Sequence, residues 1–224
     1  MLDRFSNKLR ERGLKGTFAD LFARLRSGLR SEEAWIVLLK DLGQVNPVKR
    51  PTGIVFEDIG REHLPLLSEL NREREAEEVD QRFADYVDAG FHGFIALRDG
   101  KAVGYYWWVD AEGAAEFPDL RDFGLGIELG PGEAYGSDFY ILEAHRKGRL
   151  AGEMLARIEG GLADRGYSEL WGYVVAANRP ARWLYESRGY ERLWTHTRRK
   201  RFFVSRVENS PDPRTYKGGS DVDR

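Results

Sequence analysis

Hydrophobic and polar positions alternate along the chain with two periods, one of about 3.6 residues that is typical of helices and one of 2 that is typical of strands. Helical spacing of apolar residues predicts helices over 62–71 and 150–164. The shorter period predicts strands over 54–59, 134–142 and 168–175. Helices and strands therefore follow one another in turn, which predicts an α/β domain.

The other elements have weaker patterns. We expect a second helix over 73–88, a short helix over 180–188 and a final strand pair from Gly189 onward. Residues 111–132 are rich in glycine and acidic side chains, and they predict a long loop with a short helix inside it. The apolar run 35–42 is too short for its period to separate a strand from a buried helical turn, so both stay open.

A β-hairpin is the clearest local prediction. Two apolar runs, 91–97 and 102–109, are joined by a short polar segment that contains Asp99 and Gly100. The Asp-Gly pair supplies the positive backbone angles of a tight hairpin turn. The two runs are therefore expected to pair as antiparallel neighbours.

The first 50 residues differ from the rest, and we expect them to form a helical extension followed by a linker. Apolar and basic residues recur at helical spacing over 14–30, which predicts a basic amphipathic helix. Its apolar face would pack on the main domain or on a second subunit, as in a homodimer, or would lie on an anionic membrane surface. The main domain is expected over 51–206, and a polar, disordered tail over 207–224.

Composition narrows the classes of function. The net charge is -2, so a nucleic-acid partner is not predicted. The chain has no cysteine, which excludes disulfides, thiolate zinc sites and cysteine nucleophiles. The 4 histidines lack a second ligand at the spacing of a metal site, so we expect no metal. No apolar run could span a bilayer and no signal-peptide pattern is present, so a cytoplasmic protein is expected.

The stretch from His145 to Leu155 reads as a strand end, a basic turn with glycine, and then an apolar helix. The first amides of a helix are unpaired donors, and glycine lets the backbone approach a phosphate closely. The stretch therefore predicts an anion site for the pyrophosphate of a nucleotide-like cofactor. We expect the following residues to form it: Arg146, Lys147, Gly148, Arg149, Leu150, Ala151 and Gly152.

A second stretch, 177–193, follows the strand expected over 168–175. Asn178 stands at the strand end, where its amide can bind an extended amide chain or can cap the next helix. Tyr185 projects from that helix. Its phenol is protonated at neutral pH, so it can serve as a proton donor or as a core aromatic.

Together the two stretches resemble the acetyl-CoA-binding half of the GCN5-related N-acetyltransferase (GNAT) superfamily. The superfamily motif is Arg or Gln, two residues, Gly, one residue, then Gly or Ala. Arg146 and Ala151 match its ends, whereas Arg149 stands at the middle Gly. The second stretch has the residues of the superfamily in their order: Asn178, Ala181, Leu184, Tyr185, Gly189 and Tyr190.

The resemblance implies an α/β fold with a central mixed, mostly antiparallel sheet that splits near Asn178 and binds acetyl-CoA in the split. The main chain of Ile141 and Leu142 would pair with the pantetheine arm. Amides from Lys147 to Gly152 would hold the pyrophosphate.

The resemblance also implies catalytic roles. Tyr185 would be the general acid that protonates the departing thiolate. A general base, if one is needed, would be Asp138, ahead of Glu133 and Glu128. Direct attack by a positioned amine is the usual chemistry of the superfamily, so positioning carries much of the rate.

The function expected is acetyl transfer from acetyl-CoA to a primary amine of a small molecule or peptide, by a GNAT-type acyltransferase. Of the four consecutive aromatics on the predicted hairpin, one pair would face the core and the other an acceptor cleft: Tyr105, Tyr106, Trp107 and Trp108. Two alternatives stay open. One is transfer of longer acyl or aminoacyl groups in envelope or polysaccharide assembly, with 14–30 docked on membrane; the other is a non-catalytic acyl-CoA sensor.

Overall fold

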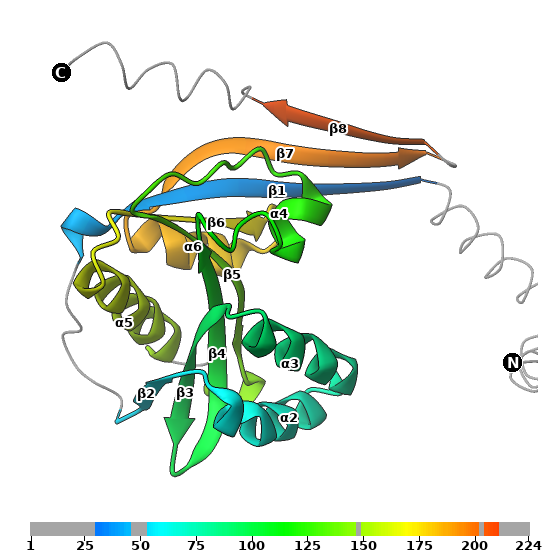
Figure 1. The fold of residues 1–224 in the computed structure, drawn as a ribbon. Helices are drawn as coiled ribbons and strands as arrows, with labels where there is room; N and C mark the ends of the chain where they lie inside the picture. The colour runs from blue at the N-terminus through cyan, green and yellow to red at the C-terminus, as the bar shows by residue number, and fades with distance from the viewer. Residues whose placement is uncertain (1–29, 46–52, 147–148, 202–203, 211–224) are drawn as a thin grey trace, which may run out of the picture.

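The computed structural model describes residues 30–45, 53–146, 149–201 and 204–210. Within these ranges eight strands form one sheet in the order β2-β3-β4-β5-β6-β1-β7-β8 (Figure 1). All neighbouring strands are antiparallel except β5 and β6, which are parallel. The strands are β1 (Arg30–Asp41), β2 (Val55–Asp58), β3 (His92–Arg98), β4 (Lys101–Asp110), β5 (Glu133–Ile141), β6 (Glu169–Val175), β7 (Glu191–Arg201) and β8 (Val204–Ser210).

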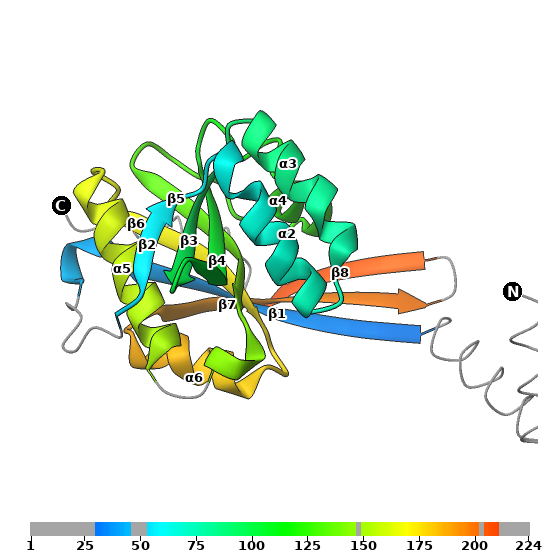
Figure 2. The ribbon, with the colours of Figure 1, turned by 90° about the horizontal axis from the view of Figure 1, so that it is seen from below.

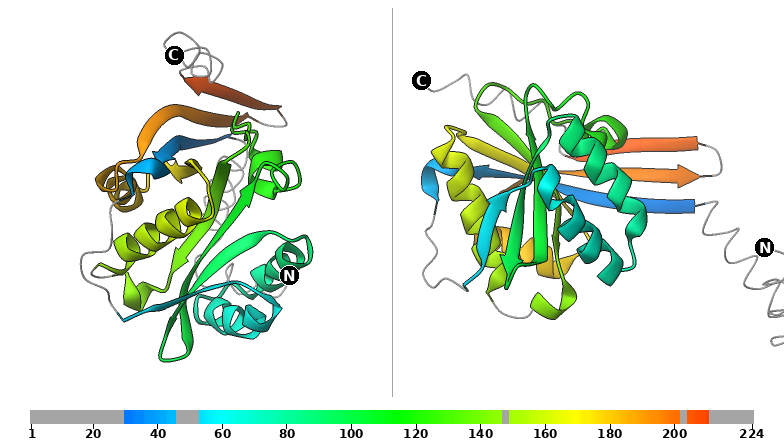
Figure 3. Two further views of the ribbon diagram at one scale, coloured as in Figure 1. Left: turned by 60° about the vertical axis from the view of Figure 1, so that its left-hand side comes forward. Right: turned by 60° about the horizontal axis from the view of Figure 1, so that its bottom comes forward.

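Helices cover both faces of the sheet (Figures 2 and 3). On one face lie α2 (Leu64–Glu73), α3 (Asp80–Asp88) and α4 (Pro118–Phe123), and on the other α5 (Leu150–Asp164) and α6 (Arg179–Ser187). Single 3-10 turns complete the described part: η1 (Leu42–Gln44), η2 (Arg61–His63), η3 (Glu77–Val79) and η4 (Glu143–His145). None of the described helices is long and apolar enough to cross a membrane.

Two apolar cores hold these layers together. Phe83 of α3 and Leu67 of α2 are buried against Trp107 of β4 on one face. Met154 and Ile158 of α5 fill the other face. Complete burial of side chains of this size contributes about 1.5–3 kcal/mol each to folding, so both helical layers are firmly attached to the sheet.

The predicted hairpin is confirmed as β3 and β4. Asp99 and Gly100 at its turn have φ values of 51° and 74°, as a two-residue turn of this type requires. The helix predicted over 150–164 is confirmed at both ends as α5. Its N-terminal boundary fixes where unpaired amides can occur.

The four consecutive aromatics of β4 are all buried, so the prediction that one of the two pairs faces an acceptor cleft is wrong; of the four, only Trp108 lines a cleft in the described part of the chain, and that cleft lies away from the split in the sheet. Tyr105 and Trp107 pack under α2 and α3, whereas Tyr106 and Trp108 pack on the α5 side. Both faces of β4 are covered by helices, which the alternation of side chains could not reveal. Tyr105 nevertheless directs its hydroxyl at a polar side chain of β5.

The helix predicted over 73–88 is interrupted. Glu75 has a left-handed φ of 56°, and Ala76 N donates a hydrogen bond to Asn71 O at 2.8 Å, which closes α2. The chain then makes η3 and starts α3 at Asp80. A non-glycine residue in the left-handed region is uncommon, so sequence propensity did not indicate this break.

Residues 30–41 are a strand inside the sheet, and the expected domain boundary at 51 is wrong for them. β1 lies between β6 and β7, and its residues Val37 and Leu38 are almost completely buried. A strand covered on both faces is apolar along its whole length, which explains why 35–42 showed no period. The predicted amphipathic helix over 14–30 lies outside the described residues except for Arg30.

The end of the main domain also differs from the expected boundary at 206. β8 continues to Ser210, so 207–210 belong to the sheet. Residues 211–224 of the predicted tail lie outside the described residues.

Candidate functional site

A wedge opens in the sheet where β5 and β6 part. The two strands pair only over Glu133–Tyr135 and Glu169–Trp171. Beyond these pairs β5 is bonded only to β4, and β6 only to β1. We call the space bordered by 137–141 of β5 and 173–175 of β6 the wedge. The sheet is thus split next to Asn178, where the sequence predicted a split.

Main-chain groups of β5 alternate between β4 and the wedge. Leu142 donates its N–H to Val103 O at 2.9 Å, and its C=O accepts a hydrogen bond from His145 N at 2.8 Å, so neither group faces the wedge, contrary to the prediction. Since successive residues of a strand direct their N–H and C=O groups to opposite sides, Ile141 and Phe139 present theirs to the wedge. Phe139 was not predicted, although the same alternation would have indicated it.

Asp138 lies at the wedge on a bulge of β5. Its φ is 46°, and the register between β4 and β5 shifts at this point. Tyr105 Oη donates a hydrogen bond to Asp138 Oδ1 at 3.1 Å, and Arg82 of α3 forms an ion pair with Oδ2. The carboxylate therefore lies on the α2 and α3 side of the wedge, with both oxygens already accepting hydrogen bonds.

Tyr105 is a permanent donor to this carboxylate. Burial and the charge of Asp138 raise the pKa of Tyr105, while Arg74 and Arg82 oppose the shift. The hydroxyl accordingly keeps its proton at neutral pH. Asp138 is fixed in place by neighbours from two other elements.

The turn before α5 is tied to the same end of β5. Arg146 Nε donates a hydrogen bond to Ile141 O at 2.8 Å, and its guanidinium carbon lies 5.1 Å from the centroid of the Tyr140 ring. Lys147 and Gly148, which the sequence analysis assigned to the anion site, lie outside the described residues.

The first turn of α5 has amides available for an anion. Glu153 N donates to Arg149 O at 2.9 Å, which is the first bond of the helix ladder. The amides of 150–152 precede this bond and have no acceptor within the helix. Arg149 is exposed at the N-cap, so its charge adds to the positive end of the helix dipole.

Asn178 caps α6 in the structure. Its Oδ1 accepts a hydrogen bond from Ala181 N at 3.2 Å, which is the capping alternative considered from the sequence. The side chain is exposed, and its Nδ2 has no hydrogen-bond acceptor among the described residues. Capping fixes the residue at which α6 starts, and therefore which of its side chains face the core of the domain; we call these side chains its inner face.

Tyr185 occupies that inner face and is half-buried. Its ring packs edge-on against Tyr190, with the ring centroids 4.9 Å apart. Burial and the charge of Glu159 raise the pKa of Tyr185 above its usual value. Tyr185 thus packs on the apolar core of the α5 side of the sheet, which also contains Tyr106 of β4 and Tyr190.

A buried ion pair anchors α6 to α5. Glu159 is fully buried on α5, and both of its oxygens accept hydrogen bonds from Arg188, which immediately follows α6. Burial raises the pKa of Glu159, and the Arg188 guanidinium opposes the shift. Sequence reasoning missed this pair, although an acidic residue on the otherwise apolar face of a helix was a usable signal.

The other predicted carboxylates lie away from the wedge. Glu133 begins β5 at its paired end, and its Oε2 accepts a hydrogen bond from Gly130 N at 2.8 Å. Glu128 is exposed in the loop before β5. Across the residues that the structure describes, no group of three or more potential metal ligands occurs.

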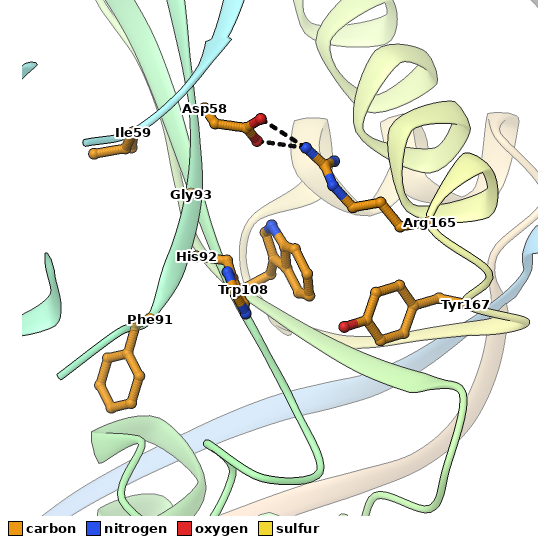
Figure 4. Close-up of a pocket in the computed structure, with 8 residues that line it drawn as sticks. All are labelled: Asp58, Ile59, Phe91, His92, Gly93, Trp108, Arg165 and Tyr167. Carbon is orange, nitrogen blue, oxygen red and sulfur yellow. Dashed lines mark hydrogen bonds and ion pairs between the residues drawn. The ribbon is translucent and has the colours of Figure 1, made fainter.

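A lateral cleft of about 320 Å³ lies at the other end of α5 (Figure 4). His92 stacks on Trp108 with centroids 4.3 Å apart, and Arg165 forms two hydrogen bonds with Asp58. Since α5 has 15 residues and rises about 1.5 Å per residue, the cleft is about 20 Å from the basic turn. It contributes no residue to the wedge.

Comparison with known proteins agrees with this geometry. The model of the acetyltransferase (GNAT) family matches residues 57–190, which is more than half of the chain. No curated protein sequence matches this chain.

Solved structures share the fold at low sequence identity. A GCN5-related N-acetyltransferase from Sphaerobacter thermophilus superposes with a TM-score of 0.53 at 16% identity, covering 81% of this chain and 56% of its own. A functionally unknown conserved protein from Staphylococcus epidermidis gives a TM-score of 0.58 at 10% identity, covering 79% and 64%. This chain thus spans less than two thirds of either protein.

A third structure contains a glucosamine N-acetyltransferase region within a fungal multi-domain β-N-acetylglucosaminidase. It superposes with a TM-score of 0.58 at 13% identity and covers 80% of this chain and 22% of its own. These likenesses concern the fold, whereas the family match covers β5 and β6, which border the wedge, and the neighbouring helices α5 and α6. The chain belongs to the acetyltransferase (GNAT) family.

Proposed function

We propose that this protein transfers an acetyl group from acetyl-CoA to a primary amine in the wedge between β5 and β6. The observation that carries the proposal is the unpaired edge of β5. There the main chain of Phe139 and Ile141 faces the wedge, next to the first turn of α5. The pantetheine arm of acetyl-CoA has two amide groups, which can pair with the free main-chain groups of β5. Its pyrophosphate needs unpaired N–H donors, which the first turn of α5 has.

The residues present fit acetyl-CoA. Phe139 and Ile141 would hold the pantetheine amides, after Arg146 Nε releases Ile141 O. The amides of 150–152 and the charge of Arg149 would hold the pyrophosphate. When bound, acetyl-CoA supplies an acetyl thioester that an amine can attack.

Tyr185 is proposed as the general acid. Its raised pKa keeps the hydroxyl protonated at neutral pH, as a proton donor requires. The Glu159–Arg188 pair and the Asn178 cap hold α6 at its two ends, so the phenol has a fixed place. A pure sensor would have no need of this proton, which favours catalysis.

Asp138 is proposed to hold the acceptor amine on the α2 and α3 side of the wedge. Its carboxylate is fixed by Tyr105 and Arg82 and is a quarter exposed, so a remaining lone pair can accept a hydrogen bond from the amine. Positioning of the amine beside the thioester then supplies much of the rate.

The test is incubation with acetyl-CoA and a panel of amines, amino sugars and peptides, with detection of free thiol and of acetylated product. We expect thiol release that depends on both the protein and an amine. Absence of thiol release with every amine, together with an unchanged melting temperature at millimolar acetyl-CoA, would overturn the proposal.

A further inference from the structure

Arg74 is held at the end of α2 by a buried polar chain. Arg74 Nε donates a hydrogen bond to Asn71 Oδ1 at 3.0 Å, and Asn71 Nδ2 donates to Asp80 Oδ1 at 2.7 Å. Asn71 is completely buried, and Ser68 donates to the other oxygen of Asp80 at 2.6 Å. An arginine at a helix end usually moves freely in water, whereas this one is oriented by side chains of α2 and α3.

The backbone around this arginine is unusual as well. Only three described residues other than glycine have positive φ, and Asp99 lies in the hairpin turn. The other two are Glu75, next to Arg74, and Asp138 at the wedge. Such conformations persist where the surrounding structure requires them, and they are frequent at ligand sites.

The guanidinium of Arg74 lies over two tyrosines at the wedge. Its central carbon is 4.4 Å from the centroid of the Tyr140 ring and 5.5 Å from that of Tyr105. Tyr105 in turn donates to Asp138. Among the described residues, no acceptor is recorded for the terminal nitrogens of Arg74. A free guanidinium edge thus stands close to the carboxylate that we assign to the acceptor amine.

The local charge favours an anion. The charges that act on Tyr105 are those of Asp138, Arg74 and Arg82, of which two are positive. The ion pair with Asp138 neutralises the charge of Arg82, so the positive charge of Arg74 is left without a carboxylate partner in the described part of the chain. Arg74 follows α2 and contacts Tyr105 and Tyr140 on the face of the sheet opposite α5. Arg146 of the basic turn reaches the same Tyr140 ring but donates to Ile141 O, whereas Arg74 is oriented by side chains of α2 and α3 beside the tyrosine that donates to Asp138. Its partner is therefore expected on the acceptor and not on the cofactor.

We propose that Arg74 binds a carboxylate or phosphate carried by the acceptor close to its amine, so that the acceptor is an anionic amine. The inference rests on the proposed function and specifies its acceptor class. A guanidinium offers two parallel N–H donors to either oxyanion, while Asp138 receives the ammonium or amine. Amino acids and amino sugar phosphates both have this arrangement.

The test uses acceptor pairs that differ only in the anionic group. Phenylalanine is compared with phenethylamine for the carboxylate, and glucosamine 6-phosphate with glucosamine for the phosphate. In the wild type we expect kcat/KM for the anionic member of at least one pair to be about 10- to 100-fold higher, the worth of one charged hydrogen-bonded contact. The preferred pair identifies the oxyanion.

Arg74→Gln should reduce that preference to within about 3-fold, while kcat/KM for the neutral member stays unchanged. Arg72→Gln is the matched control, because Arg72 is an exposed arginine on the same turn of α2, and it should keep the full preference. Arg74→Lys keeps the charge without the planar edge and should retain part of the preference, so it serves if the glutamine variant melts early.

Equal use of both members of each pair by the wild type would overturn the inference, and so would an equal loss on both members in Arg74→Gln. Either result leaves the proposed function intact, provided that acetyl-CoA is consumed. Failure of acetyl-CoA to bind or to react with any amine would instead refute the proposed function itself.

Discussion

The two sides of the wedge are built from different parts of the polypeptide. On the α5 side, the groups assigned to acetyl-CoA are the main-chain groups of Phe139 and Ile141 and the amides of 150–152, with the charge of Arg149 beside them. On the α2 and α3 side, the groups assigned to the acceptor are side chains from four elements: Arg74, Arg82, Tyr105 and Asp138. Only the first side has a sequence pattern that can be recognised along the chain.

This difference explains why the motif tolerates a substitution. Arg149 stands where the superfamily has glycine, yet α5 still begins at Leu150 and leaves the amides of 150–152 unpaired. A main-chain site keeps its donors whatever the side chain, so long as the backbone is unchanged. A side-chain site changes its ligand when one residue changes, and a family can therefore share a donor and differ in acceptors.

The largest effect is expected for Tyr185→Phe, which removes the hydroxyl that we propose as the proton donor. The ring and its packing against Tyr190 remain, so affinity for acetyl-CoA should stay the same. We expect kcat to fall by about 10²-fold, because general acid catalysis is typically worth 10²- to 10⁴-fold and a thiolate is a tolerable leaving group. Steady-state turnover and calorimetric binding check this.

Tyr167→Phe is the control for that variant, since it removes a hydroxyl that donates to Asp110 at the far end of α5. Its turnover should match the wild type. Full turnover of Tyr185→Phe would show that Tyr185 is only a packing aromatic, and collapse of acetyl-CoA binding would make it part of the cofactor cleft.

A second prediction sharpens the main-chain side. Arg149→Glu puts a negative charge beside the free amides of α5 and should raise the Kd for acetyl-CoA by about 10- to 100-fold. Arg149→Gly restores the superfamily residue and keeps the amides but removes the side-chain charge, so it should raise the Kd by only about 3- to 10-fold. Arg157→Glu, the same charge reversal two turns further along α5, should leave it unchanged. Equal losses in all three variants would contradict a site made of amides.

A third prediction concerns the side-chain side. Asp138→Asn keeps a residue that tolerates the left-handed φ but removes the negative charge, so kcat/KM for the amine should fall about 10-fold. The Kd for acetyl-CoA should not change. Asp85→Asn, on the exposed surface of α3, is the control. If Asp138→Asn weakened acetyl-CoA binding more than it lowered kcat/KM for the amine, Asp138 would belong to the cofactor site and not to the acceptor site.

The smallest effect is expected in the pH dependence. The pKa of Tyr185 is raised above its ordinary value of about 10, so the phenol keeps its proton, and therefore its role, up to at least that pH. In the wild type, kcat should rise as the acceptor amine loses its proton, and it should not decrease at any pH lower than about 10. A fall near pH 8 that disappears in Tyr185→Phe would contradict the assignment.

Local patterns predicted most of the elements because their physical causes are local. The Asp99–Gly100 turn and the apolar face of α5 depend on near neighbours in the chain, and both were found as expected. β1 depends on distant strands: its position between β6 and β7 is fixed by pairing with residues at least 128 positions away. No local pattern contains that information.

The site divides in the same way. The basic turn and Tyr185 are recognisable from their spacing, whereas Arg74 is significant only because α2 returns to the wedge and because Asn71 orients it. The break at Glu75, which directs Arg74, contradicts the helical pattern over 73–88. Rules for local structure fail most readily at such strained sites.

Amide hydrogen exchange with and without acetyl-CoA tests the central claim most directly. If the cofactor pairs with the free edge of β5 and the first turn of α5, exchange should slow over 137–142 and 149–153, including the amides of Phe139 and Ile141. The lateral cleft around His92 and Tyr167 should exchange as before. Protection confined to the cleft, or none at saturating acetyl-CoA, would contradict binding in the wedge.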